Sequence, residues 1–133
     1  MTAYDELCAW TLGNGDATFI HQHVVDAHAA QVADESTKPI ALAMALVGLY
    51  LKVEHNWTGR SIQLAHMRLA RAKRDWPAFA LPFGRGAMRE EEVLAADDRA
   101  AAIDEWAADV WAAYAESNRA IADTLVREGG ITP

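Results

Sequence analysis

One stretch of the chain constrains its fold more than any other. Residues 40–53 are apolar on every side when they are projected on a helix, and the uninterrupted apolar run 40–51 is too short to span a bilayer. A soluble helix that is apolar all round must be buried by its neighbours on all sides. The sequence therefore predicts a central helix enclosed by further helices.

The remaining sequence supplies those helices. Alanine is abundant, runs of β-branched residues are nearly absent, and glycine and proline fall between the periodic segments, which together favour an all-α fold. A chain of 133 residues forms one domain. We expect a compact helical bundle of four to five main helices with a long C-terminal helix, in a single domain over residues 1–133. The predicted helices cover about 3–12, 18–33, 40–53, 59–75, 90–96 and 99–128.

Polar residues at the segment boundaries predict where these helices begin. Thr2, with Asp5 three residues later, is a variant of the capping box, and Pro39 lies in a first turn, where its missing N–H costs nothing. Thr58 is the expected cap of the fourth helix, and Asp97 or Asp98 that of the last.

Charge and cysteine content exclude several classes of partner. The chain has 12 Lys and Arg against 19 Asp and Glu, for a net charge of −7, which disfavours nucleic acids and anionic membranes. Cys8 is the only cysteine, so no internal disulfide can form, and a reducing compartment is expected. With no basic region of a signal peptide at the N-terminus, we expect a cytoplasmic protein.

Polar residues cluster within the second predicted helix. Three of the five histidines, His21, His23 and His28, fall within eight positions. His21 and His28 share a face but lie two turns apart, about 10 Å, which is too far to ligate one metal ion directly. His23 and Asp26, three residues apart, can meet one ion or each other.

The levels of residues in neighbouring helices can be compared by counting outward from the turn at Ser36, between the second and third predicted helices, and from the turn at Trp57, between the third and fourth. This count places polar groups of different helices at the same level. His66 falls opposite Gly48, and Asp26 falls opposite Leu46, so Asp26, Gly48 and His66 share a layer within one helical turn. Glycine inside a helix costs about 1 kcal/mol relative to alanine, so Gly48 requires a packing or functional reason. The sequence thus predicts an internal site where Gly48 leaves space for two ionisable groups.

Three kinds of chemistry fit this cluster. Asp26 and His66 can form a structural hydrogen-bond network between two helices, since buried polar groups need partners whatever their role. They can act as a general acid and base. Alternatively, His66, Asp26 and His21 can hold zinc or a similar divalent ion with water as the nucleophile, although neither Glu-x-x-His pairs nor His-Glu-x-x-His is present.

Further residues extend the predicted site. His21, Gln63 and Arg60 are the candidate ligand-binding groups beside the catalytic candidates His66 and Asp26. Arg60 opens the fourth helix, where it can pair with Glu54 or bind an anion at the mouth of the bundle. The aromatic and proline-rich loop 76–89 is expected to cover the opening.

Two functions of different class follow. The first is a small-molecule-binding bundle with a buried His, Asp and Gln site, either metal-assisted or a general acid and base enzyme. The second is a non-catalytic interaction protein that forms a homodimer through its alanine-rich last helix, with Trp111 exposed. The sequence defines neither the reaction nor the substrate.

Several motifs follow one another along the chain: His21-Gln22-x-x-Val25-Asp26-Ala27 with Gln31, Gly48-Leu49-Tyr50-Leu51, Thr58-Gly59-Arg60 with Gln63, Ala65-His66-Met67 and Trp76-Pro77. As a set they resemble a bacterial family of small all-helical proteins described only as a domain of unknown function. The resemblance implies a helical bundle over most of the chain and favours His21, Asp26, Gln63 and His66, while tyrosine is common in that family at the position of His28. A looser similarity is to DinB-like metal-binding helical bundles, although their paired histidines one turn apart are missing here.

Overall fold

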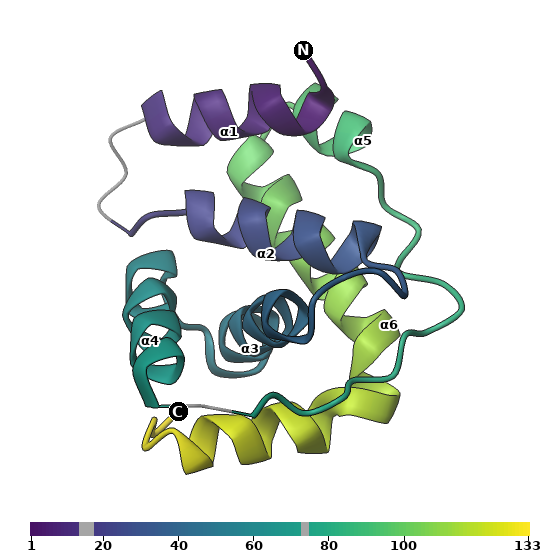
Figure 1. Ribbon diagram of the computed structural model, residues 1–133. Helices are drawn as coiled ribbons and strands as arrows, with labels where there is room; N and C mark the ends of the chain where they lie inside the picture. Colours follow the sequence, from purple (N-terminus) through teal and green to yellow (C-terminus); the bar gives the residue numbers. More distant parts are fainter. Residues whose placement is uncertain (14–17, 73–74) are drawn as a thin grey trace.

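The described part of the chain folds into helices, with the longest connection between the fourth and the fifth of them (Figure 1). The computed structural model describes residues 1–13, 18–72 and 75–133, and these contain no strand. The expected all-α fold with a long C-terminal helix is therefore confirmed. The helices are α1 (Ala3–Gly13), α2 (His21–Val32), α3 (Pro39–His55), α4 (Gly59–Ala72), α5 (Glu90–Ala95) and α6 (Arg99–Glu128).

Helix α3 lies at the centre of the fold, as its composition predicts. It packs against α2, α4 and α6, and Figure 1 shows it nearly end-on between them. Every residue from 45 to 51 is buried, so no face of this part of the helix meets water. Burial of a continuous apolar surface of this kind is the main favourable contribution to folding.

Most helix ends follow the predicted caps. The backbone N–H of Asp5 donates to Oγ1 of Thr2, and that of Thr2 donates to Oδ2 of Asp5, both at 3.1 Å. Oδ1 of Asp98 accepts from the N–H of Ala101 at 3.1 Å, which caps α6. The predicted last residues of the fourth helix include Lys73 and Arg74, which lie outside the described residues.

The start of α2 differs from the prediction. The helix begins at His21 rather than at Thr18, because Phe19 adopts a left-handed backbone conformation with φ of 61°. The turn before α2 packs on the first residue of α4: a Cβ on Gly59 would lie 1.8 Å from the carbonyl oxygen of Phe19. A close contact with a distant residue, which periodicity cannot reveal, thus sets the helix boundary.

Helix α6 bends along its length. Figure 1 shows its C-terminal part, in yellow, turning to run beneath α3 and α4. Near the turn, Nδ2 of the fully buried Asn118 donates to the carbonyl oxygen of Tyr114 at 3.0 Å. Side chains that enter the backbone hydrogen-bond ladder are a known cause of sharp bends, and we attribute this bend to Asn118.

The buried face of α6 includes Asn118 and Trp111. Ser117 is exposed, whereas Asn118 beside it is buried. Trp111 was expected to be exposed as a dimer contact; it is only 2% exposed, and its Nε1 donates to Oε2 of Glu54 at 2.7 Å. The proposed homodimer surface therefore loses its aromatic anchor to the core of the same chain.

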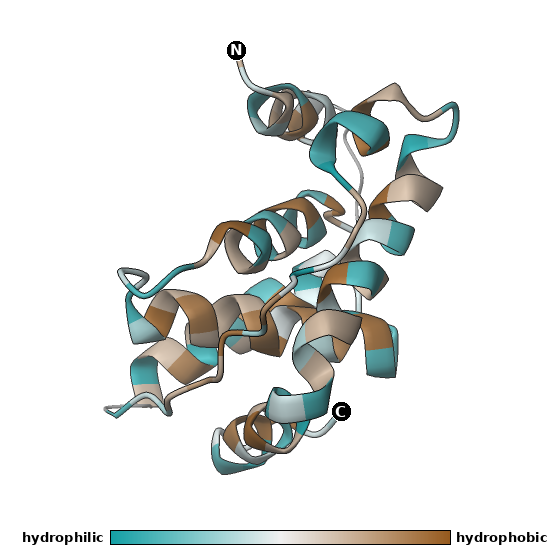
Figure 2. Cartoon of the chain, turned by 90° about the vertical axis from the view of Figure 1, so that its right-hand side faces the viewer, coloured by the Kyte–Doolittle hydropathy of each residue, from teal (hydrophilic) through white to brown (hydrophobic). Residues whose placement is uncertain are grey.

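The connection between α4 and α5 lies along α6 (Figure 2). Asn118 forms two hydrogen bonds with the backbone of Ala80, and Oδ2 of Asp109 accepts from the N–H of Met88 at 2.8 Å. Gln31, at the end of α2, donates to the carbonyl oxygen of Met88 at 2.8 Å. These bonds hold the loop against α6 and the end of α2.

Within the described ranges, no helix combines enough length with enough apolar character to cross a membrane.

The role of Asn118 gives a test of the fold. Replacing Asn118 with Ala removes its bonds to Ala80, at 2.7 and 2.8 Å, and to Tyr114. We expect a loss of about 1–3 kcal/mol in the free energy of unfolding, measured by urea denaturation, because polar groups lose their partners. The neighbouring variant Ser117→Ala changes an exposed residue and should stay within about 0.5 kcal/mol. Equal effects of the two variants would contradict the docking role of Asn118.

Candidate functional site

Asp26 on α2 is buried against α3. Its side chain lies directly over Gly48, where an added Cβ would be 1.9 Å from Oδ2 of Asp26. The residue is 3% exposed, so its carboxyl group has almost no contact with solvent. Gly48 therefore leaves a space that Asp26 fills. The sequence analysis expected this space to receive two ionisable groups, but the three heavy atoms nearest to an added Cβ all belong to Asp26.

Burial controls the charge of Asp26. Oδ1 accepts from Nε2 of Gln22 at 3.0 Å, whereas Oδ2 is buried with no hydrogen-bond partner among the described residues. Desolvation raises the pKa of the carboxyl group well above its usual value of 3.8, and the bond from Gln22 only partly opposes this effect. Burial thus shifts Asp26 towards its protonated form, in which it can donate a hydrogen bond.

His66 on α4 presents a matching group. Burial lowers the pKa of its imidazole below 6.5, and a hydrogen bond with the backbone of Met44 has a smaller, opposite effect. Nε2 of His66 is buried and has no hydrogen-bond partner among the described residues. The ring is therefore neutral near pH 7, with one donor and one acceptor nitrogen.

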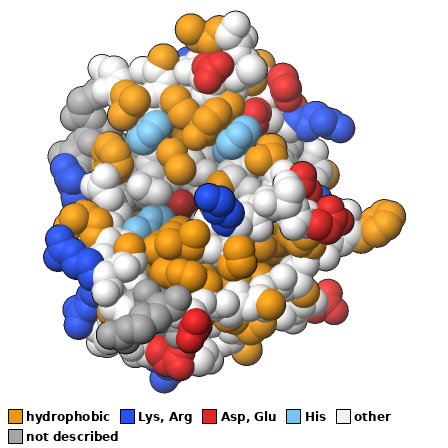
Figure 3. All heavy atoms as spheres, viewed as in Figure 1, with side chains coloured by type: hydrophobic (Ala, Val, Ile, Leu, Met, Phe, Trp, Pro, Cys, Tyr) orange, Lys and Arg blue, Asp and Glu red, His pale blue; other side chains and the backbone are white. Residues whose placement is uncertain are grey.

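Both groups lie along the same face of α3. Asp26 contacts Gly48, and His66 bonds to Met44, one helical turn earlier, which corresponds to about 6 Å along the axis. Two buried polar atoms without partners at neighbouring positions are unusual, because nearly all buried polar groups in proteins are hydrogen-bonded. Figure 3 shows histidine side chains, surrounded by apolar ones, on the face formed by α1, α2 and α4.

His21 connects α2 to α1 instead of joining this pair. Its Nδ1 lies 2.9 Å from Oγ1 of Thr11. Because that hydroxyl donates to the carbonyl oxygen of Leu7 at 3.0 Å, it accepts from the ring nitrogen of His21. Burial lowers the pKa of His21.

Arg60 and Gln63 form a separate pair in the first turns of α4. Nη1 of Arg60 donates to Oε1 of Gln63 at 2.7 Å, and its guanidinium lies over the ring of Phe19, 5.5 Å from the centroid. Glu54, the other partner considered for Arg60, bonds instead with Trp111 and Arg119.

No three His, Cys, Asp or Glu side chains of the described residues come together in a position to hold a metal ion. The predicted ligand set of His66, Asp26 and His21 is therefore not assembled in this part of the chain.

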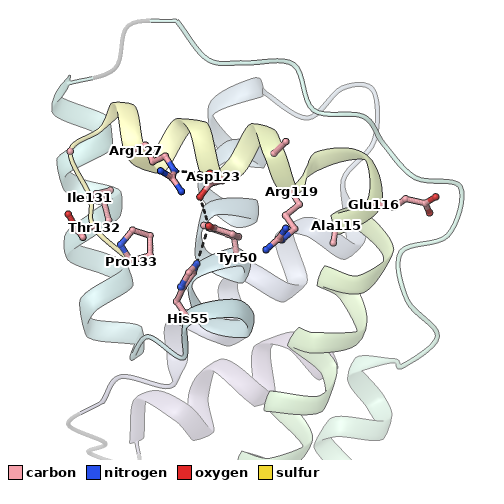
Figure 4. A pocket seen from close by; sticks show the side chains of 12 residues that line it. Tyr50, His55, Ala115, Glu116, Arg119, Asp123, Arg127, Ile131, Thr132 and Pro133 are labelled. Carbon is pink, nitrogen blue, oxygen red and sulfur yellow. Dashed lines mark hydrogen bonds and ion pairs between the residues drawn. The ribbon is translucent and has the colours of Figure 1, made fainter.

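The structure also contains a cavity that the sequence analysis missed. It has a volume of about 1120 Å³ and lies between the end of α3, the second half of α6 and residues 130–133 (Figure 4). Oη of Tyr50 donates to Oδ1 of Asp123 at 2.6 Å, and Nε2 of His55 lies 3.0 Å from the same hydroxyl, to which it donates. One signal could have revealed it, because Arg119, Asp123 and Arg127 follow one another at i, i+4 spacing.

Burial and hydrogen bonds together determine the charge states of Tyr50 and Asp123 in this cavity. Burial, followed by the bond to Asp123, raises the pKa of Tyr50 to about 12, so its hydroxyl stays protonated. The bond from Tyr50 is the main cause that lowers the pKa of Asp123. Nε of Arg127 donates to the other oxygen of Asp123 at 2.8 Å.

Fold and site together define a small all-helical protein with a buried carboxyl group and a largely buried imidazole beside its central helix. The chain belongs to the family described as "Family of unknown function (DUF5946)", whose model matches residues 1–115. The comparisons give no support to the looser DinB-like similarity. Searches of curated proteins and of solved structures found no match.

The contact between Asp26 and Gly48 predicts the effect of a single methyl group. Alanine is the better helix former by about 1 kcal/mol, so propensity alone predicts that Gly48→Ala stabilises the protein. The overlap with Asp26 reverses the sign, and we expect a net loss of about 1–3 kcal/mol in thermal or urea unfolding.

Two comparisons isolate this overlap. Gly13→Ala is the matched control, because a Cβ there meets no heavy atom of the described residues within 4 Å. In the background of Asp26→Ala, the cost of Gly48→Ala should largely disappear. A cost that persists in that background would show that Asp26 is not its cause.

The raised pKa of Asp26 predicts a pH dependence of stability. A native pKa above the unfolded value of 3.8 provides stability that is complete below pH 3.8 and is lost as pH rises through the native pKa. Asp26→Asn cannot ionise, so its stability relative to the unmodified protein should increase from pH 4.5 towards pH 8 in urea denaturation. A difference that does not change with pH would contradict the buried, protonated carboxyl group.

Proposed function

We propose that this chain binds a small molecule through Asp26 and His66, and that the group it recognises is neutral and polar, such as a carboxamide. The observation that carries the proposal is the pair of buried, unpartnered atoms, Oδ2 of Asp26 and Nε2 of His66, beside one face of α3.

The charge state of the pair supports a neutral ligand. Burial favours the uncharged form of both groups, so neither offers a counter-charge to an ionic ligand. An isolated charge placed there would carry a large desolvation cost. A carboxamide has one acceptor oxygen and an adjacent N–H donor, which complement a protonated carboxyl group and a neutral imidazole.

The segment that the family model matches includes this place. Residues 1–115, which the family model matches, contain Asp26 and His66 together with Gln22 and Gly48, the side chain and the space that position Asp26. A protonated carboxyl group and a neutral imidazole are also suited to exchange protons with a bound substrate, so general acid and base catalysis is the enzymatic form of this proposal.

The alternative function, a homodimer through α6, has less support. Trp111, its proposed anchor, is buried, and the C-terminal part of α6 buries Leu125 and Val126 in the core of the same chain.

Titration with butyramide and butyrate tests the proposal, with the imidazole ¹⁵N resonances of His66 as the readout. Butyramide should cause a saturable shift that butyrate at the same concentration does not. Asp26→Ala and His66→Ala should each weaken binding by about tenfold, the effect of losing about 1.4 kcal/mol of hydrogen bonding. Because His66→Ala has no imidazole to observe, binding to this variant is followed through the backbone amide resonance of Gln22.

The variant Asp26→Asn tests whether Asp26 binds the ligand as a neutral hydrogen-bond donor or as a carboxylate. Its amide still donates a hydrogen bond, so this variant should retain butyramide binding. Asp34→Ala and His28→Ala replace the same residue types elsewhere and should leave the affinity unchanged, with folding checked by circular dichroism. Binding of butyramide that is insensitive to both Asp26→Ala and His66→Ala, or an absence of binding, overturns the proposal.

A further inference from the structure

We propose that the cavity between α3 and α6 is a second binding site, which takes a small oxyanion through Arg119 and Arg127. This site is separate from the Asp26 and His66 pair, and its two arginines lie beyond residues 1–115, the part matched by the family model.

The two guanidinium groups flank the same space. In Figure 4, Arg119 and Arg127 lie on either side of Tyr50, and their guanidinium groups point towards the cavity. They come from positions two turns apart on α6, so one helix sets their separation.

Each arginine is anchored through one nitrogen only. Nε of Arg119 donates to Oε1 of Glu54 at 2.5 Å, and Nε of Arg127 donates to Oδ2 of Asp123 at 2.8 Å. Neither residue's Nη atoms have a hydrogen bond within the described residues, and the side chains are 64% and 74% exposed. The carboxylates therefore orient both groups while leaving the paired N–H donors that bind oxyanions.

The partner carboxylates also limit the charge of the ligand. Glu54 and Asp123 balance the two arginines, and Glu116 at the rim adds a negative charge. Attraction therefore depends on directed hydrogen bonds more than on net charge, and a monoanion is favoured over a dianion. A carboxylate satisfies this condition at pH 7 better than a phosphate monoester does.

The wall of the cavity adds a preference for an apolar tail. Ala115, Ala120, Ile131 and Pro133 line it beside the polar groups. Contact with such a surface contributes favourably for each CH₂ group that it buries. Butyrate should therefore bind more tightly than formate.

Trp111 provides a natural reporter for this site. Its indole Nε1–H donates to Oε2 of Glu54, whose other oxygen accepts from Arg119. Its ring also lies 5.9 Å from that of Tyr50. An oxyanion that engages Arg119 changes the electronic environment of Glu54, and thus the indole N–H resonance of Trp111.

The experiment is a titration of the ¹⁵N-labelled chain with butyrate, formate, inorganic phosphate and butyramide at constant ionic strength. The Trp111 indole signal is assigned with Trp111→Phe. Butyrate should give a saturable shift and bind more tightly than formate and phosphate, whereas butyramide should give none. Tighter binding of phosphate than of butyrate supports the oxyanion site and assigns the ligand to phosphates.

Variants at the exposed arginines test the contacts without disturbing the core. Arg119→Gln and Arg127→Gln should each weaken butyrate binding by about tenfold, because each removes charge-assisted hydrogen bonds. Arg127→Lys retains the charge but loses the paired donors, so it should also weaken binding. Arg71→Gln, an exposed arginine of α4, should change nothing.

The proposal is overturned if butyrate and phosphate give no saturable shift, if sodium chloride reproduces the shift, or if Arg119→Gln and Arg127→Gln bind butyrate as tightly as Arg71→Gln does.

Discussion

The need to cover α3 on every side organises the whole structure. Residues 45–51 of this helix are buried without interruption, so α2, α4 and α6 must each contribute an apolar face to it. Helix α6 can do so along its length only because it bends near Asn118 and passes beneath the other helices. Close packing also explains why Gly48, against Asp26, and Gly59, against the backbone of Phe19, stand where a neighbouring chain segment leaves no room for a Cβ.

The same central helix positions both polar sites. Met44 and Gly48 receive His66 and Asp26 near its middle, while Tyr50 and His55 face the cavity near its end. The two places differ in solvation. In the first, burial favours the neutral forms of the groups, whereas in the second, exposed arginines pair with carboxylates as ions. This difference in solvation underlies the two kinds of ligand that we propose.

Sequence patterns were most reliable where local physics decides the outcome. The caps formed by Thr2 and Asp98, and the central position of residues 40–53, follow from backbone hydrogen bonding and hydrophobicity, and both are confirmed. The errors share a different cause. The true start of α2 depends on a contact with Gly59, and the inward position of Asn118 depends on a loop 38 residues away. Contacts between distant segments leave no periodic signal in a single sequence.

The amino-acid sequence by itself determined the helices, the burial of the third of them and the use of Gly48 as a space for a polar group, because propensity, capping and hydrophobic periodicity are local properties. Tertiary structure alone decided that His21 would bond to Thr11, that Trp111 would turn inward to Glu54, and that Tyr50 would meet Asp123 across a cavity. Each of these pairs joins different helices, and the bend and packing of those helices set its distance.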